Sequence, residues 1–349
     1  MPPPPGKLIF VRAIFLFISL FVPAFPPTLP AADPWIEAPF TSQSEIRPPA
    51  QPPRPASTLR IASWNIEWFP AGQRAGAQDP SNLQTAAAAA LINELQPDLL
   101  AVQEIRNLPA LQQLNRNLGL WPFSHLAASW FYKPNTSGTP PPERIEQQCG
   151  ILSRHPWEEI WEIDFTPLQE KPRPARGWLA ARFRIHAATF TLYTGHLKSD
   201  YGADSPEKAA SNRAQRAAAI RHLARDLERR QLDPYRDRIL IAGDFNADIG
   251  TADRSQETLF DDLERLGFRS ALQPARRTDA ITVPARDGVP HVPDLTLDYI
   301  FLSSAWGDPP PLQILAKGAS KKKDVFGGDA PGLASDHYPV YVDLTIPLR

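Results

Sequence analysis

The chain has 349 residues, a formal net charge of −1 and 42% hydrophobic residues. That length suggests one large domain or two small ones, and the hydrophobic content is enough for a buried core. The near-zero net charge excludes a protein that attracts polyanions through its overall charge, so any recognition of phosphate must be local. The single cysteine, Cys149, excludes an internal disulfide.

The first 24 residues have the layout of a secretory signal peptide, because Lys7 and Arg12 precede an apolar run at residues 13–22. The run is shorter than the ~20 residues of a membrane-spanning helix, although an uncleaved anchor stays an alternative. We therefore expect a secreted or periplasmic protein. The many prolines at residues 25–58 favour an extended linker with no folded domain of its own.

The folded domain is expected to begin with a strand at residues 59–69, whose sequence LRIASWNIEWF alternates apolar and polar residues. An alanine-rich helix is predicted at residues 83–95 and a second strand at residues 99–105. Asn65 lies on the first strand, and Glu104 lies at the end of the second. A strand, a helix and a strand that ends in an acid predict a layered domain of helices and sheets.

Further elements follow in the second half of the chain. A basic turn that contains Arg176 leads into a strand at residues 178–185, and the next strand delivers His196. The clearest helix is predicted at residues 206–231, where apolar residues recur with helical period. These elements extend the alternation of strands and helices along the chain.

The most informative stretch is RILIAGDFNAD at residues 238–248. Its apolar run indicates a buried strand, and polar side chains follow at Asp244, Asn246 and Asp248. Because alternate residues of an extended chain point the same way, we expect these three to converge. Carboxylate and amide oxygens suit a hard cation such as Mg²⁺. A calcium-binding EF-hand loop is disfavoured, since its sixth position is Ile249 rather than glycine.

The last part of the chain adds three more polar residues. A strand predicted at residues 295–302 carries Asp298, and Asp336 and His337 precede the final strand. Each polar residue has an ordinary structural explanation when taken singly, such as a turn cap or a solvated acid. Their occurrence at the ends of several strands is what indicates a functional site, because such ends usually carry binding and catalytic groups.

The motifs SWNIEWF, LLAVQEI, GHLKSD, AGDFNAD, LDYIFLS and SDHYPV resemble those of the endonuclease/exonuclease/phosphatase superfamily. The resemblance spans residues 59–349, which we interpret as a catalytic domain. It implies an α+β fold, a four-layer α/β/β/α sandwich of the DNase I type with the active site at one end of two packed sheets. Within the superfamily, the chain is most similar to bacterial secreted nucleases.

The resemblance also implies three roles for the polar residues: metal binding, catalysis and substrate contact. Mg²⁺ is the expected cofactor, with Mn²⁺ or Ca²⁺ as alternatives. His337, oriented by Asp298, is expected to be a general base or a phosphate clamp, and the choice of base between His337 and Asp244 stays open. The expected metal ligands are Asn65, Glu104 and Asp336, the expected catalytic residues are His196, Asp244, Asn246, Asp298 and His337, and the expected substrate contact is Arg176.

Three functions remain open from the sequence. The favoured one is a metal-dependent extracellular nuclease, and the second is a phosphodiesterase or phosphatase acting on phospholipid head groups or small phosphate esters. A catalytically inactive binding module is disfavoured, because every expected catalytic position is filled. We expect a monomer that has a nucleic acid or another phosphodiester as substrate and no stable protein partner.

Overall fold

The chain divides into two compact units, Met1–Asp33 and Pro34–Arg349, and all residues that the structure describes belong to the second. The structure is a computed structural model. It describes residues 40–43, 54–70, 80–119, 121–131, 147–163, 165, 171–200, 202–250, 256–273, 280–285, 294–319 and 333–348.

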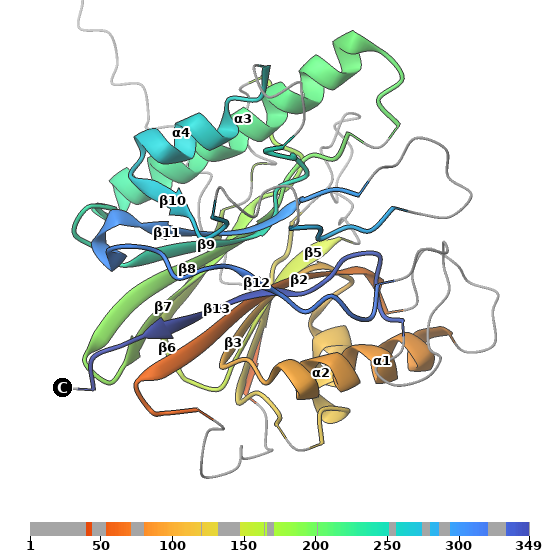
Figure 1. Cartoon of the computed structure of the whole chain (residues 1–349), viewed down its shortest axis with the longest axis vertical. Helices are drawn as coiled ribbons and strands as arrows, with labels where there is room; N and C mark the ends of the chain where they lie inside the picture. The colour runs from red at the N-terminus through yellow and green to blue at the C-terminus, as the bar shows by residue number, and fades with distance from the viewer. Residues whose placement is uncertain are drawn as a thin grey trace, which may run out of the picture. The chain divides into compact units, whose positions relative to one another are not determined.

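Two mixed β-sheets stack on each other and form the centre of this unit (Figure 1). The first sheet has seven strands in the order β1-β4-β5-β3-β2-β13-β12. Its strands are β1 (Phe40–Gln43), β2 (Thr58–Phe69), β3 (Leu99–Ile105), β4 (His125–Ala128), β5 (Gln148–Ser153), β12 (Gln313–Ile314) and β13 (Val340–Thr345).

The second sheet has six strands in the order β10-β11-β9-β8-β7-β6. The strand expected at residues 295–302 begins only at Asp298, because Leu295 pairs with Val283 in an isolated bridge. Its strands are β6 (Trp157–Ile163), β7 (Trp178–Ile185), β8 (Ala188–His196), β9 (Ile239–Asp244), β10 (Phe268–Ser270) and β11 (Asp298–Ser303).

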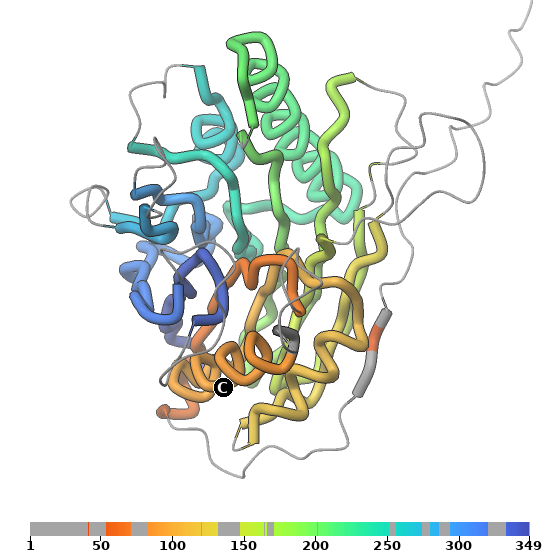
Figure 2. The backbone as a smooth tube through the Cα atoms, turned by 90° about the vertical axis from the view of Figure 1, so that its right-hand side faces the viewer, coloured from red at the N-terminus to blue at the C-terminus, as the bar shows by residue number. Residues whose placement is uncertain are grey.

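Helices cover the outer faces of both sheets. Helices α1 (Pro80–Leu95) and α2 (Leu108–Arg116) lie on the first sheet, while α3 (Pro206–Arg229) and α4 (Leu259–Arg265) lie on the second (Figures 1 and 2). A short 3₁₀ helix, Ser304–Trp306, follows β11. The expected four-layer α/β/β/α sandwich is confirmed.

The core has two parts that match these layers. One cluster lies between the first sheet and its helices, and it includes Trp64, Leu91 and Leu114. The larger cluster joins the inner faces of both sheets and α3, with Ile61 from the first sheet and Leu192 from the second. Since the larger cluster is apolar, buried and shared by both sheets, it holds them in a fixed relation, and the site depends on that relation.

Each sheet contains one parallel pair of strands, and each pair is joined through a helix. β2 and β3 are parallel and are connected through α1, while β8 and β9 are parallel and are connected through α3. Such βαβ units bring the carboxyl ends of both strands to the same edge. β2 contacts β9, and β3 contacts β8, across the two sheets. Four strand ends therefore meet at one end of the sandwich.

The segment at residues 25–58, expected to be a linker, contributes one strand to the sheet. β1 pairs antiparallel with β4, with Phe40 opposite Ala128 and Gln43 opposite His125. This stretch thus has a ladder of backbone hydrogen bonds, which the proline content alone did not predict. The expected signal peptide, residues 1–24, lies outside the described residues. Among the helices that are described, none combines the length and the hydropathy required to cross a membrane.

Candidate active site

The candidate site begins with four side chains at the carboxyl ends of the two parallel pairs. Asn65 comes from β2 and Glu104 from β3 in one sheet, and His196 from β8 and Asp244 from β9 in the other. His196 and Asp244 are register partners. The residues directly before them, Gly195 and Gly243, pack so closely that a Cβ on Gly243 would lie 2.1 Å from the Gly195 carbonyl oxygen. Only glycine lets these two strand ends come together.

Asn65 joins the two sheets at this point. Its Nδ2 donates to Asp244 Oδ2 at 3.0 Å and to Glu104 Oε1 at 3.3 Å. The side chain is buried, and its Oδ1 accepts the backbone N–H of Glu67 at 3.0 Å. Asn65 and Asp244 are 179 residues apart in sequence. Their contact is therefore a direct product of sheet packing.

The backbone around Glu104 adopts left-handed conformations that residues other than glycine rarely take. Glu104 has φ of +61°, Glu67 +33° and Trp68 +48°. The N–H of Trp68 donates to Glu104 Oε2 at 3.0 Å. Residues with positive φ are sparse and cluster at functional sites, where the fold overcomes their strain. In this left-handed conformation the Glu104 carboxylate lies beside Asn65 of the neighbouring strand.

Asp244 is held by hydrogen bonds to both of its oxygens. Oδ1 accepts the N–H of Asn246 at 2.8 Å, and Oδ2 accepts the Asn246 Nδ2 at 3.0 Å. Asn246 has φ of +50°, so the chain is no longer extended there. For this reason Asp248 does not join the site, contrary to the expected convergence: it accepts from Gly250 N at 2.6 Å and Thr296 N at 3.1 Å.

His337 and Asp298 form a buried pair beside Asp244. His337 Nδ1 lies 2.8 Å from Asp298 Oδ2, and its Nε2 lies 4.0 Å from Asp244 Oδ2. Asp298 opens β11, which runs antiparallel to β9, so Asp298 is the register partner of Asp244. The loop that carries His337 is fixed by Trp64, whose Nε1 donates to the His337 carbonyl oxygen at 2.9 Å.

His196 lies beside the carboxylates of Asp244 and Glu104. Its Nε2 lies 3.4 Å from Asp244 Oδ2 and 3.7 Å from Glu104 Oε1. The side chain is buried, and within the described chain its Nδ1 has no hydrogen-bond partner. Two imidazoles therefore converge on Asp244, each presenting its Nε2.

The surroundings shift the pKa values of His196, His337 and Asp244 in different directions. Burial, with a smaller contribution from the positive charge of Arg176, holds the pKa of His196 well below 6.5. Burial also lowers the pKa of His337, but attraction to Asp298, Asp244 and Glu104 outweighs it and raises that pKa to about 9. Burial raises the pKa of Asp244 to about 7, against the attraction of His337. At neutral pH the site holds a neutral His196 and a cationic His337.

Two expected residues lie at the margin of this cluster. Asp336 reaches it from the histidine side, with Oδ1 3.8 Å from His337 Nε2. Arg176 donates to the carbonyl oxygens of His196 and Leu197, at 3.5 Å and 3.2 Å, and to Gln147 Oε1. Arg176 thus supports the loop after β8, and its contact with substrate stays a prediction.

Three supporting residues were not predicted from the sequence. Ser335 Oγ donates to the Asn65 carbonyl oxygen at 2.6 Å and accepts the His337 N–H at 3.0 Å. Gln103 Nε2 joins Ser63 of β2 to Thr194 of β8, at 3.2 Å and 3.0 Å. Gln147 binds Arg176. Ser335 and Gln103 belong to the motifs SDHYPV and LLAVQEI, which is a signal for them, but the motifs do not show which hydrogen bonds their side chains form.

The cluster fits a hydrated Mg²⁺ better than a cation enclosed by protein. Among the described residues, no three His, Cys, Asp or Glu side chains form a ready-made cage. Glu104 keeps a side-chain exposure of 13%. Mg²⁺ is commonly held by one or two carboxylates, with waters and substrate phosphates completing the octahedron. The Glu104 carboxylate matches that mode. Asn65 presents its Nδ2 to Glu104, while its Oδ1, the atom that could bind a cation, accepts the Glu67 N–H.

A family model described as Endonuclease/Exonuclease/phosphatase family matches residues 62–337. No curated protein sequence matches the chain. Among solved structures, sphingomyelinase C from Streptomyces griseocarneus is 16% identical with a TM-score of 0.56, covering 82% of this chain and 99% of that one. Truncated TDP2 from Caenorhabditis elegans is 16% identical with a TM-score of 0.51, covering 82% and 97%. A family protein from Bacteroides thetaiotaomicron is 15% identical with a TM-score of 0.51, covering 83% and 98%.

Proposed function

Because the chain belongs to the endonuclease/exonuclease/phosphatase family, we propose that it is a metal-dependent phosphodiesterase whose substrate is a nucleic acid. The observation that carries the proposal is the meeting of the His337–Asp298 pair with Asp244 where the two sheets end. Hydrolysis of a phosphodiester needs a group that takes a proton from water and groups that stabilise charge on the phosphate. A carboxylate and a cationic imidazole at this separation supply both.

The protonation behaviour of the two residues supports Asp244 as the general base. With a pKa of about 7, Asp244 can accept a proton from an attacking water near neutral pH, and Asn246 keeps the carboxylate in place. With a pKa of about 9, His337 enters the reaction as a cation and therefore as a donor. It can stabilise a phosphate oxygen or give its proton to the leaving oxygen.

His196 suits a different task from His337. Its low pKa keeps the imidazole neutral, so it is a poor source of a proton for the leaving oxygen. A neutral imidazole can still donate one hydrogen bond to a phosphate oxygen. We therefore assign His196 to holding the phosphate.

Glu104 would hold the divalent cation, with Asp336 as a further ligand and Asn65 as another once its amide turns Oδ1 toward the cation. When bound, Mg²⁺, or Mn²⁺ or Ca²⁺ in its place, acts as a Lewis acid that offsets negative charge on the phosphate. The residues of the chain orient the water, the phosphate and the protons around it.

A nucleic acid is preferred to a phospholipid because of the surface around the site. An enzyme that reaches lipid head groups at a bilayer needs exposed apolar side chains near its active site. In the described part of the chain the exposed large hydrophobic residues are Leu83, Tyr235 and Leu348, and none belongs to the catalytic cluster. We propose that the protein acts as a monomer, secreted or periplasmic, on DNA or RNA.

The proposal is tested by incubating the purified protein with plasmid DNA, RNA, sphingomyelin vesicles and bis-p-nitrophenyl phosphate, with Mg²⁺ or with excess EDTA. We expect cleavage of DNA or RNA with Mg²⁺, and no cleavage with EDTA or with His337→Ala. Hydrolysis of sphingomyelin without cleavage of nucleic acid would favour the phospholipid alternative. Full activity in EDTA would contradict metal dependence.

A further inference from the structure

A second charged cavity lies away from the catalytic cluster, at the opposite end of the second sheet. It has a volume of about 530 Å³, which is within the range of small-molecule sites. Thr191 on β8 lies five residues before His196, a separation of roughly 16 Å along a strand. We call this cavity the arginine pocket, after the residues that define it: Arg182, Arg184, Arg230, Arg236, Arg238 and Thr191.

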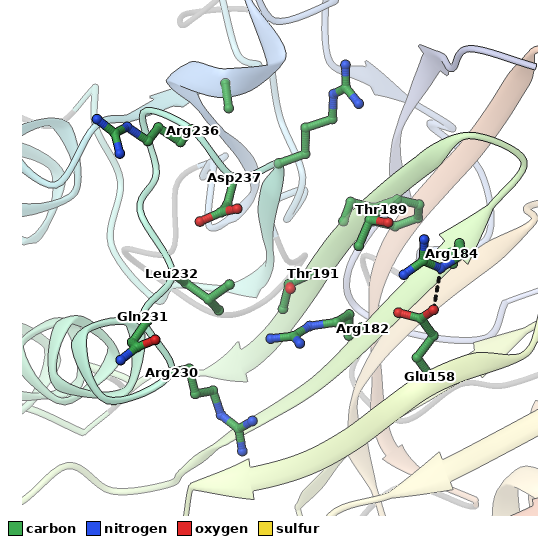
Figure 3. Close-up of a pocket in the computed structure, with 13 residues that line it drawn as sticks. Glu158, Arg182, Arg184, Thr189, Thr191, Arg230, Gln231, Leu232, Arg236 and Asp237 are labelled. Atoms are coloured by element: carbon green, nitrogen blue, oxygen red, sulfur yellow. Dashed lines mark hydrogen bonds and ion pairs between the residues drawn. The ribbon is translucent and has the colours of Figure 1, made fainter. Parts of the chain in front are cut away.

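Strands β7 and β8 and the connection between α3 and β9 form most of its walls. Arg182 and Arg184 are alternate residues of β7, so they share one face, and they stand opposite Thr191 and Thr189 of β8. Figure 3 shows Arg182 and Thr191 facing the segment that follows α3, which carries Arg230. The remaining arginines come from the turn before β9.

The turn before β9 is held firmly. Asp237 Oδ2 accepts the N–H of Asp233 at 2.8 Å, and the Asp233 carbonyl oxygen accepts the N–H of Asp237 at 2.6 Å. The carbonyl oxygen of Arg238 accepts the N–H of Thr191 at 2.9 Å. The arginines therefore project from an ordered frame, which lowers the entropic cost of binding a ligand between them.

Nearby carboxylates neutralise the positive charge of these arginines only in part. Arg184 pairs with Glu158 at 2.5 Å and Arg230 pairs with Glu159 at 2.7 Å, and both acids are about 40% exposed. Arg230 is itself only 11% exposed and also lies 3.4 Å from the buried Asp226, so its charge is compensated more fully than that of Arg184. Among the described residues, the ion-pair partner of Arg182 is the same Glu159, at 3.8 Å. The pairs of Arg184 and Arg182 are exposed and therefore weak, so a more strongly charged anion can displace their carboxylates.

The turn before β9 adds the guanidinium groups of Arg236 and Arg238 to the lining of the pocket. Arg236 lies 3.6 Å from Asp233, and its side chain is 87% exposed. Arg238 stacks over Trp306 at 5.5 Å and forms no ion pair with any described residue. The lining contains five arginines against the two carboxylates Glu158 and Asp237. The cavity thus presents an excess of planar cationic donors.

We propose that the arginine pocket binds a compact oxyanion that carries two or more phosphate groups, such as an inorganic polyphosphate or the polyphosphate part of a nucleotide. Arginine forks match phosphate oxygens in geometry and charge. The guanidinium groups come from both walls, so a chain of phosphates can engage more of them than a single phosphate can. The hydroxyls of Thr189 and Thr191 offer neutral donors between them. A long nucleic-acid backbone fits less well, because the exposed carboxylates Glu158 and Glu159 lie beside these arginines and would repel further phosphates.

The test is isothermal titration calorimetry of the full chain with tripolyphosphate, in metal-depleted buffer at constant ionic strength. Arg182→Gln with Arg238→Gln should weaken binding about tenfold or more, the scale of losing charge-assisted hydrogen bonds. Arg182→Lys with Arg238→Lys should retain most of the affinity, which guards against loss through misfolding. The matched control, Arg221→Gln with Arg265→Gln, removes two surface charges outside the pocket and should bind as the wild type does.

His337→Ala separates this site from the catalytic one and should bind tripolyphosphate normally. The proposal is overturned if the wild type does not bind, or if the control pair weakens binding as much as the pocket pair. It is also overturned if His337→Ala abolishes binding while the pocket pair retains it. A single-stranded oligonucleotide that binds through the same arginines, with no binding of tripolyphosphate, would identify a nucleic-acid surface in place of the proposed site.

Discussion

The contact with Asp298 orients the imidazole of His337, on which the proposed chemistry depends. Asp298 Oδ2 lies 2.8 Å from His337 Nδ1, and the pair is buried. A carboxylate at Nδ1 fixes the tautomer and the ring orientation, and it leaves Nε2 directed at Asp244 and at the phosphate. The charge of Asp298 is also the largest factor that raises the pKa of His337.

Asp298→Asn keeps the shape of the side chain and removes this charge. We predict a fall in kcat on the order of 10²–10⁴, the range of general acid–base groups. His337→Ala should be at least as damaging, and the double variant should be far from additive, because residues that act as one unit lose their function once. The measurement is kcat of the wild type, the two single variants and the double variant with bis-p-nitrophenyl phosphate at saturating Mg²⁺. If the two losses multiply, Asp298 is only a buried strand acid.

The same variant should change the pH dependence of the reaction. A cationic His337 loses its proton as the pH rises through a pKa of about 9, so activity should fall on the alkaline side. Without the Asp298 carboxylate that pKa is lower, and the alkaline limb of kcat/KM should move toward neutral pH. The measurement is a pH–rate profile of the wild type and Asp298→Asn. An alkaline limb at the same pH in both proteins would exclude His337 as the group that titrates.

At the scale of elements, α3 controls the loop that follows His196. Arg216 on this helix is only 2% exposed and binds Glu257 Oε2 at 2.6 Å and Asp200 at 3.0 Å. Its Nη1 also donates to the Lys198 carbonyl oxygen at 2.8 Å. One buried guanidinium therefore ties the helix to the end of β8.

Arg216→Met should lower the free energy of unfolding by about 3–5 kcal/mol, because it leaves the Glu257 carboxylate buried without its partner. Arg216→Met combined with Glu257→Met should recover part of the loss, since an apolar pair carries no uncompensated charge. Arg221→Met, on the exposed side of the same helix, is the control and should be near neutral. Urea unfolding measures all four proteins. A double variant less stable than Arg216→Met would contradict this account.

Apolar patterns in the sequence predicted the long elements. The sequence that became β2 alternates apolar and polar residues, that of β9 is a continuous apolar run, and α3 has a helical repeat. The short strands β10 and β12 were missed, because two or three residues carry no period. Their existence depends on the neighbouring strands that they pair with.

The membership of the site was predictable from motifs, but its geometry was not. Asn65 meets Asp244 only because two sheets pack, and that information is spread over the whole core. Asp248 shows the limit of local reasoning. On an extended chain Asp248 would point the same way as Asp244. The left-handed backbone at Asn246 changes the direction of the chain, so Asp248 lies outside the site. Gln103 lies in the LLAVQEI motif, but its supporting role was missed, because the motif does not show that its amide joins β2 to β8.

At the scale of the whole molecule, the first prediction concerns export. The apolar run at residues 13–22 behind Lys7 and Arg12 predicts cleavage by a signal peptidase. The protein isolated from a Gram-negative host should begin between Phe25 and Asp33 when analysed by mass spectrometry. An intact Met1 in the cytoplasmic fraction would contradict a cleaved export signal, and an intact Met1 in the membrane fraction would favour the uncleaved anchor.

A cation held at the candidate site would couple metal binding to folding. Glu104 and Asn65 come from different strands, and Asp244 from the other sheet, so these groups meet only in the folded chain. A cation that binds the folded state alone stabilises it by RT ln(1 + [L]/Kd), about 2.7 kcal/mol at one hundred times Kd. For a large domain, each kcal/mol raises Tm by about 2–4 °C. Mg²⁺ should therefore raise Tm by several degrees, and EDTA should reverse the change.

Glu104→Gln tests whether this carboxylate is the ligand. The variant should need a higher Mg²⁺ concentration for the same rise in Tm, because a site built from few charges loses one of them. Glu264→Gln removes an acid on the exposed surface of α4 and should respond to Mg²⁺ as the wild type does. Thermal unfolding across a Mg²⁺ titration compares the three proteins. Identical midpoints in the wild type and Glu104→Gln would show that the cation stabilises the fold elsewhere, and the assignment of Glu104 would then be wrong.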